Sequence, residues 1–190
     1  MIVRDTASEL AGKIQSGDLI EAGTHNLLVY DDLKTLRDIF GNCAKVLLPR
    51  NEIVLLASQY DALDTLKHSL QQKGVNVAKH MDDGTLFIID AQLGYQAADT
   101  YGTLKLAMTL ISRAKKEGRQ GITWLGDMGS FFAYGRISEL VDYELFCPTK
   151  YEDILKIVCC YHEVDFNSLD KKHKDKLIQH HYKSIFVDNK

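Results

Sequence analysis

The sequence is poor in proline and tryptophan, and it lacks the marks of a secreted or membrane protein. Its 190 residues include two prolines and one tryptophan. No apolar stretch approaches the roughly 20 residues that a membrane-spanning helix needs. Residues 1–18 also lack the apolar middle part of a secretion signal. We therefore expect a cytoplasmic location and no membrane partner.

The sequence also lacks paired cysteines and the usual spacing of metal ligands. Its four cysteines are Cys43, Cys147, Cys159 and Cys160, and its late histidines are His162, His173, His180 and His181. None of them forms a CxxC or HxxxH pair, the spacings typical of zinc sites. Adjacent residues of a strand point to opposite faces, so at most one of Cys159 and Cys160 can serve a given site. We expect reduced thiols, no metal and no cofactor.

The sequence also lacks a large excess of charges of one sign. The chain carries 23 basic and 26 acidic side chains, for a net charge of -3. This balance gives no general reason to expect nucleic-acid binding. The basic stretch 171–176 lies on one predicted helix face without interleaved aromatic residues, which is more typical of a solvated surface. We expect no direct contact with nucleic acid.

Apolar runs alternate with helical patterns along the chain. The sequence predicts strands at 27–30, 52–58, 76–80, 85–90, 122–126, 154–161 and 184–187. It predicts helices at 31–47, 61–73, 99–118, 136–146 and 169–181. Residues 151–156 could instead be helical. Strands that read as unbroken apolar runs indicate a mostly parallel sheet covered on both faces, so we expect an α/β three-layer sandwich.

Residues 1–24 differ from the rest of the chain. Leu10 and Ile14 have helical spacing, and Gly17, Asp18 and Gly23 are expected stops. We therefore divide the chain into an N-terminal helix and linker at 1–24 and a main domain at 25–190.

The sequence has one part of a nucleotide site and lacks the other. The run that ends at Asp90 resembles a Walker B strand, whose carboxylate orients magnesium at a phosphate. However, the chain has no GxxxxGK[ST] loop. Instead, Tyr30 is followed by Asp31 and Asp32, which repel phosphate and suit a helix N-terminus. Asp90 is therefore more readily interpreted as a carboxylate that caps a loop.

Several side chains at strand ends are candidates for a site. His25 begins a strand that Tyr30 ends, and their separation of five places them on opposite faces. His25 either fixes the entering chain or has a functional role. Tyr30, Trp124 and Tyr161 either pack in the core or line an apolar pocket. No spacing supports nucleophilic catalysis, so we do not expect an enzyme.

Several features follow one another along the chain: His25 to Tyr30, the strand 52–58, the loop 124–128, the pair Tyr143-Glu144, the strand that ends at Cys160-Tyr161, and His180-His181. Taken in this order, they resemble a known family, the MEDS (methanogen/methylotroph sensory) domain. The resemblance covers roughly residues 24–187. It implies a RecA/KaiC-like fold that has lost the phosphate loop.

The resemblance also implies a function and site residues. The family is thought to sense small molecules and occurs fused to DNA-binding domains or histidine kinases. His25, Tyr30, Glu144 and Tyr161 are the implied site positions, to which Asp90 and Trp124 are added from the strand ends. The implied ligand is a small organic molecule, and the implied partner is a signalling protein such as a kinase or transcription regulator.

Three functions follow as hypotheses. The first is a sensory module that binds a small, largely apolar ligand at the strand carboxyl ends and does not hydrolyse NTP. The alternative is a degenerate nucleotide-binding protein or NTPase that uses Asp90 for magnesium. The third is a structural subunit, since RecA-like folds often form a homo-oligomer.

Overall fold

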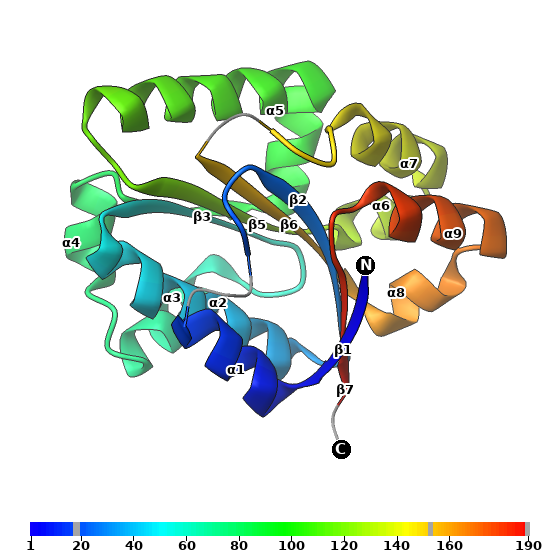
Figure 1. The fold of residues 1–190 in the computed structure, drawn as a ribbon, viewed down its shortest axis with the longest axis horizontal. Coiled ribbons are helices and arrows are strands. Elements are labelled where there is room, and N and C mark those ends of the chain that lie inside the picture. The colour runs from blue at the N-terminus through cyan, green and yellow to red at the C-terminus, as the bar shows by residue number, and fades with distance from the viewer. Residues whose placement is uncertain (17–19, 152–153, 189–190) are drawn as a thin grey trace.

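One parallel sheet forms the centre of the molecule (Figure 1). The structure is a computed structural model that describes residues 1–16, 20–151 and 154–188. The strands are β1 (Ile2–Thr6), β2 (Thr24–Tyr30), β3 (Glu52–Ser58), β4 (Leu86–Asp90), β5 (Gly121–Asp127), β6 (Leu155–His162) and β7 (Ser184–Asp188). Their order in the sheet is β1-β7-β2-β6-β5-β3-β4, and every pair of neighbouring strands is parallel. The α/β prediction is confirmed.

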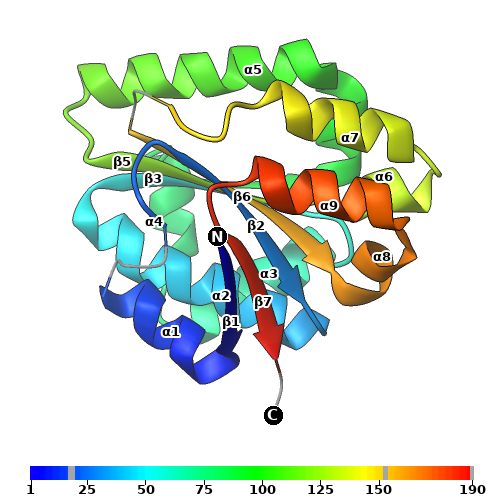
Figure 2. The ribbon, with the colours of Figure 1, turned by 45° about the vertical axis from the view of Figure 1, so that its right-hand side comes forward.

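Helices cover both faces of this sheet (Figure 2). One face is covered by α1 (Ala7–Ser16), α2 (Leu33–Leu47), α3 (Leu63–Gln72) and α4 (Val77–Asp82). The other is covered by α5 (Ala91–Lys116), α6 (Gly129–Ala133), α7 (Ile137–Phe146), α8 (Glu163–Ser168) and α9 (Lys171–His180). A short 3₁₀ turn, η1 (Leu48–Arg50), follows α2. No helix within the described residues is long and apolar enough to cross a membrane.

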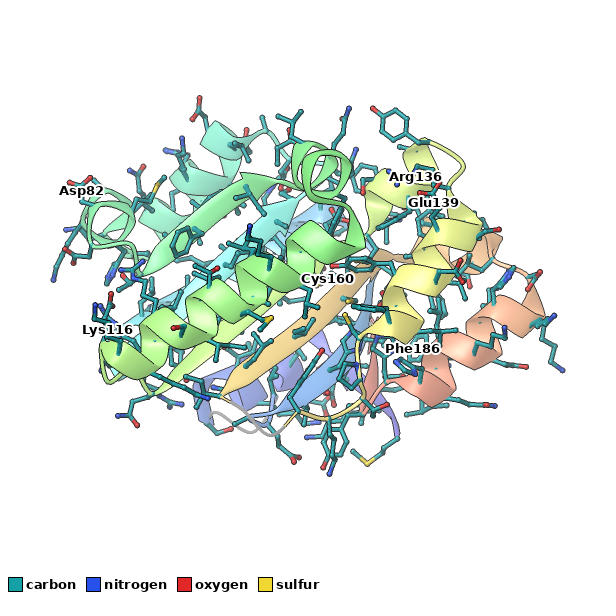
Figure 3. The ribbon with its side chains drawn as sticks, turned by 90° about the horizontal axis from the view of Figure 1, so that it is seen from above. Asp82, Lys116, Arg136, Glu139, Cys160 and Phe186 are labelled. Carbon is teal, nitrogen blue, oxygen red and sulfur yellow. The ribbon has the colours of Figure 1, made fainter. Side chains whose placement is uncertain are left out.

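Alternation along the strands divides the core into two clusters. In β6, Val158 and Cys160 belong to the core under α1–α4, whereas Cys159 and Tyr161 belong to the core under α5–α9. Seen from above, Cys160 lies in the strand that runs between α5 and α7 (Figure 3). Because adjacent side chains of a strand point to opposite faces, Cys159 and Cys160 lie in different halves of the molecule.

The N-terminal segment is more than the predicted helix. The helix is present as α1, but β1 precedes it and pairs with β7 at the edge of the sheet. Leu10 and Ile14 of α1 pack in the same core as α2. Residues 17–19, where a stop was predicted, lie outside the described residues. Strand β1 was missed because its five residues include two charged side chains and few apolar ones.

Two further predictions and one alternative are wrong, wholly or in part. Residues 77–80 belong to the helix α4 and not to a strand, because the Asn76 side chain accepts a hydrogen bond from the Lys79 N–H and caps the turn. Helix α5 begins directly after Asp90, earlier than the predicted start at 99. The helical alternative for 151–156 fails at its end, since Leu155 and Lys156 belong to β6; residues 152–153 lie outside the described part.

Candidate functional site

Four side chains of the kinds that bind metal ions meet on the face of the sheet that α5–α9 cover. His25 comes from β2, Glu144 from α7, Cys159 from β6, and His181 from the end of α9. We call these four residues the His–Glu–Cys cluster. Strand β2 pairs with β6 so that Leu27 lies opposite Cys159. His25 precedes Leu27 by two residues and therefore also lies beside β6. The cluster joins residues that are far apart in the chain.

The donor atoms of the cluster are close together and fully enclosed. The Nε2 atom of His25 lies 3.2 Å from the Cys159 Sγ and 3.2 Å from the Glu144 Oε2. The Nε2 atom of His181 lies 3.3 Å from the same Oε2. The side chains of His25, Glu144 and His181 are 0 % exposed, and Cys159 is buried. The His25 and His181 rings are tilted against each other with centroids 4.2 Å apart.

Two hydrogen bonds orient this cluster from outside. The Tyr161 hydroxyl donates to the Glu144 Oε1. The His181 Nδ1 lies 2.7 Å from the Leu177 carbonyl oxygen. A carbonyl only accepts, so Nδ1 carries a proton and donates it to Leu177. The Nε2 atom of His181 is therefore turned toward Glu144.

Burial controls the protonation of these groups. Burial lowers the pKa of His25, which favours the neutral ring. Burial also raises the pKa of the Cys159 thiol well above its ordinary value, and the nearby Glu144 adds to this rise. For Glu144, burial acts to raise the pKa, but His181 and His25 outweigh it and hold the pKa below its ordinary value. These shifts favour the ionised form of Glu144 and the protonated form of the Cys159 thiol.

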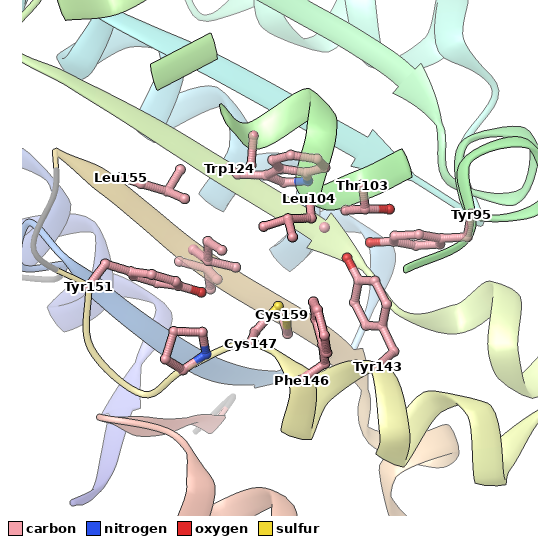
Figure 4. A pocket seen from close by; sticks show the side chains of 15 residues that line it. Tyr95, Thr103, Leu104, Trp124, Tyr143, Phe146, Cys147, Tyr151, Leu155 and Cys159 are labelled. Carbon is pink, nitrogen blue, oxygen red and sulfur yellow. The ribbon is translucent and has the colours of Figure 1, made fainter. Parts of the chain in front are cut away.

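An apolar pocket adjoins the cluster between α5, α7 and the sheet (Figure 4). Its volume is about 70 Å³. Its lining is Tyr95, Thr103, Leu104, Ala107, Trp124, Gly126, Tyr143, Phe146, Cys147, Pro148, Tyr151, Leu155, Ile157, Val158 and Cys159. Cys159 belongs to both the pocket and the cluster. Gly126 makes room for the pocket wall, since a Cβ there would lie 2.6 Å from the Tyr95 hydroxyl.

A second polar group lies on the opposite face, at the carboxyl ends of the strands. The Tyr30 hydroxyl donates to the Asp127 Oδ2 at 3.4 Å. The backbone N–H groups of Gly129 and Gln59 donate to the same carboxylate at 3.0 and 3.3 Å. Burial raises the pKa of Asp127 to about 7. As predicted, Tyr30 and His25 point to opposite faces.

The other predicted residues have separate places. Trp124 lines the pocket, whereas Glu144 and Tyr161 join His25 in or beside the cluster. Asp90 lies apart from all of them, on the edge strand β4, and accepts a hydrogen bond from the Leu93 N–H at the start of α5. The carboxylate that faces the β2–α2 junction is therefore Asp127. Asp90 is a capping carboxylate, as the simpler interpretation held, but it caps the start of α5 and not a loop.

Cys159 and His181 were missed as partners of His25. Zinc-type spacing along the chain cannot reveal them, because the four cluster residues come from four separate elements. One signal was present: Cys159 and Tyr161 share a strand face by alternation, and Tyr161 was already a candidate. The contribution of His181 depends on how α9 ends and could not be read from the strand pattern.

Comparison with known proteins adds a family and a fold. The family model described as MEDS, "MEthanogen/methylotroph, DcmR Sensory domain", matches residues 24–181. No curated protein matches the chain. A crystal structure of an uncharacterized protein from Pyrococcus horikoshii, in complex with an unknown peptide, is similar with a TM-score of 0.65 and 14% sequence identity. The match covers 93% of this chain and 82% of that one, and it shows a shared fold.

Proposed function

We propose a ligand-sensing function that starts from one established point, namely that this chain belongs to the MEDS family of sensory domains. The proposed ligand is a small, largely apolar organic molecule, and the proposed site is the pocket between α5, α7 and the sheet. Most of its lining is aromatic or aliphatic. Pockets with such linings favour apolar ligands, because water inside them has few hydrogen-bond partners.

The position of the pocket differs from the expected one. The sequence hypothesis puts the ligand at the strand carboxyl ends, but the β6 residues that line the pocket run from Leu155 to Cys159, toward the amino end of that strand. The carboxyl ends are occupied by the contact between Tyr30 and Asp127. A volume of about 70 Å³ accommodates several water-sized groups and therefore a ligand of a few heavy atoms.

Helix α7 connects the proposed ligand pocket with the proposed partner surface. This helix supplies Tyr143 and Phe146 to the pocket and Glu144 to the His–Glu–Cys cluster. Phe146 is 48% exposed, and Met108 of the neighbouring α5 is 63% exposed. A ligand that moves α7 or α5 would change this partly apolar outer surface. We propose that a signalling protein, such as a kinase or transcription regulator, binds there.

NTP hydrolysis is not part of the proposal. The Asp32 side chain accepts a hydrogen bond of 2.7 Å from the Thr35 N–H and so occupies the N-terminus of α2. A phosphate would need that position, and Asp31 adds a second negative charge beside it. Titration calorimetry with ATP and magnesium should give no binding heat. Saturable binding that Asp90→Asn abolishes would support the nucleotide-binding alternative.

Thermal-shift measurements with small alcohols, halogenated hydrocarbons and simple aromatic compounds test the sensor proposal. A ligand at 100 times its Kd stabilises the folded state by about 2.7 kcal/mol, which raises Tm by roughly 5–10 °C for a chain of this size. Ala107→Leu fills the pocket and should weaken binding at least about tenfold. The control Ala133→Leu lies on the exposed end of α6 and should bind normally.

Two outcomes would contradict the sensor proposal. The first is that no compound of these classes raises Tm. The second is that the Ala107→Leu protein, folded by circular dichroism, binds a stabilising compound as well as the unchanged protein does. In that case the ligand would sit outside the pocket.

A further inference from the structure

We propose that the His–Glu–Cys cluster is a binding site for one divalent transition-metal ion of the zinc class. The ligands would be the Nε2 atoms of His25 and His181, one carboxylate oxygen of Glu144 and the Sγ of Cys159. This inference rests on the cluster itself and does not require an organic ligand in the neighbouring pocket.

The donor atoms already have nearly the spacing of a tetrahedral site. One ligand atom from each of the four residues lies within 4.8 Å of the others. Zinc–ligand bonds of 2.0–2.3 Å place neighbouring ligand atoms about 3.3–3.6 Å apart around a tetrahedron. The three contacts through His25 Nε2 and Glu144 Oε2 measure 3.2, 3.2 and 3.3 Å. Small side-chain movements would therefore admit the ion.

Two of these buried atoms have unused bonding capacity. Glu144 Oε2 and His181 Nε2 have no hydrogen-bond partner among the described residues, although they lie 3.3 Å apart. His181 donates a hydrogen bond from Nδ1 to the Leu177 carbonyl, so its Nε2 can either carry a proton toward the Glu144 carboxylate or offer a lone pair to an ion between them. Two lone pairs at this distance repel unless a positive species lies between them. A proton or a metal ion supplies it.

The surroundings resemble the outer sphere of a metal site more than a simple ion pair. Metal-bound histidines commonly donate their second N–H to a carbonyl, as His181 does to Leu177. Metal-bound carboxylates are commonly hydrogen-bonded through the other oxygen, as Glu144 is by Tyr161. Both contacts leave the inward atoms free to coordinate. The Cys159 Sγ lies 3.2 Å from His25 Nε2 and adds a sulfur ligand beside the two histidines and the carboxylate.

The donor set selects the class of metal. Imidazole and thiolate ligands suit zinc and similar borderline ions, whereas magnesium and calcium prefer sites made of oxygen atoms. Because Cys159 also lines the pocket, the ion would lie at the pocket floor. It would also fasten β2, α7, β6 and the end of α9 together, so binding should stabilise the fold.

Metal titration of the whole chain tests the proposal. Chelator-treated protein should bind one Zn²⁺ or one Co²⁺ per chain, and either ion should raise Tm. Bound Co²⁺ should show a near-ultraviolet thiolate-to-cobalt charge-transfer band, which reports the Cys159 ligand directly. Cys159→Ser should remove the band and weaken Co²⁺ binding at least tenfold. The matched control Cys160→Ser changes the adjacent buried cysteine on the opposite face and should keep both.

A measurement on the unchanged protein covers the case in which a variant fails to fold. Bound Zn²⁺ should slow the alkylation of Cys159 at least tenfold relative to chelator-treated protein, as identified by peptide mass analysis. The proposal is overturned if neither ion raises Tm or gives the charge-transfer band, or if both cysteine variants lose metal equally. It is also overturned if Zn²⁺ leaves Cys159 alkylation unchanged. The cluster would then be held by a shared proton.

Discussion

Tyr161 supports the Glu144 carboxylate through a single hydroxyl. Its side chain is fully buried, and the hydroxyl donates to an oxygen that is out of reach of solvent. Tyr161→Phe removes this donor and keeps the ring that packs against Phe166. Hydrogen bonds to charged groups contribute about 1.5–3 kcal/mol, so we expect a loss of that size in the free energy of unfolding.

Urea unfolding measures this loss. Tyr134→Phe is a suitable control, because that ring lies about half exposed after α6, and the change should stay within about 0.5 kcal/mol. If Tyr161→Phe loses no more unfolding free energy than the control, then the Tyr161 hydroxyl does not stabilise the Glu144 carboxylate.

The raised pKa of Asp127 predicts that the free energy of unfolding depends on pH. Burial raises its pKa in the folded protein to about 7, from an ordinary value of 3.8. Between these pH values the folded state holds a proton that the unfolded chain has released. Stability contributed by this group therefore falls as pH rises from about 4 to about 7, by up to ~4 kcal/mol.

Asp127→Asn imitates the protonated form and should remove this part of the pH dependence. Urea midpoints at several pH values should therefore fall less steeply for the variant than for the unchanged protein. At neutral pH the variant should be at least as stable. A variant that is less stable at every pH would show that the N–H groups of Gly129 and Gln59 require the ionised carboxylate.

Single residues were predictable where strand alternation decides them. The opposite orientation of His25 and Tyr30 follows from a separation of five, and that of Cys159 and Cys160 from adjacency. Contacts across elements were not predictable in this way. The approach of His181 to Glu144 depends on the packing of α9 against α7, which no local pattern in the sequence encodes.

At the scale of elements, the junction between β2 and α2 depends on one cap. The Asp32 side chain accepts a hydrogen bond from the Thr35 N–H, and the pKa of Asp32 is held below its ordinary value mainly by that bond. Asp32→Ala should cost about 1 kcal/mol of unfolding free energy, as typical N-cap losses do. Asp32→Asn keeps an accepting oxygen and should cost clearly less.

Chemical denaturation of the two Asp32 variants at neutral pH compares them directly. Equal losses of unfolding free energy in Asp32→Ala and Asp32→Asn would show that the negative charge of Asp32 at the N-terminus of α2 matters more than the hydrogen bond.

Elements were predictable where the apolar pattern is long. Strands β3 and β5, each buried along its whole length, match predicted apolar runs closely. The short helix α4 was taken for a strand because five residues carry too little periodicity to separate the two. Its type is decided by the Asn76 cap and by Val77, which packs in the core.

For the whole molecule, the parallel sheet followed from apolar strands alternating with helices, but the edges of the sheet did not. Strand β1 pairs with β7 and so protects what would otherwise be an open edge. Strand β1, which includes Arg4 and Asp5, lacks the unbroken apolar run of a central strand. The order of strands therefore had to come from the structure, and with it the place of residues 1–16 in the same layers as the rest.

Deletion of residues 1–16 tests how the molecule uses this edge. The deletion removes β1 and also α1, whose Leu10 and Ile14 are buried against the core. The loss of those two side chains alone should lower the free energy of unfolding by about 3–6 kcal/mol. In addition, the backbone N–H and C=O groups of β7 that pair with β1 become open to another chain.

We therefore expect the truncated protein to self-associate, with a mass by light scattering that rises with concentration. Leu10→Ala separates the two effects, because it leaves β1 in place while creating a core cavity that typically costs 2–5 kcal/mol. That variant should lose stability and keep the mass of the unchanged protein. If Leu10→Ala self-associates to the same degree, loss of stability drives the association. If the truncated chain keeps its mass at every concentration, β7 does not need β1 as a cover.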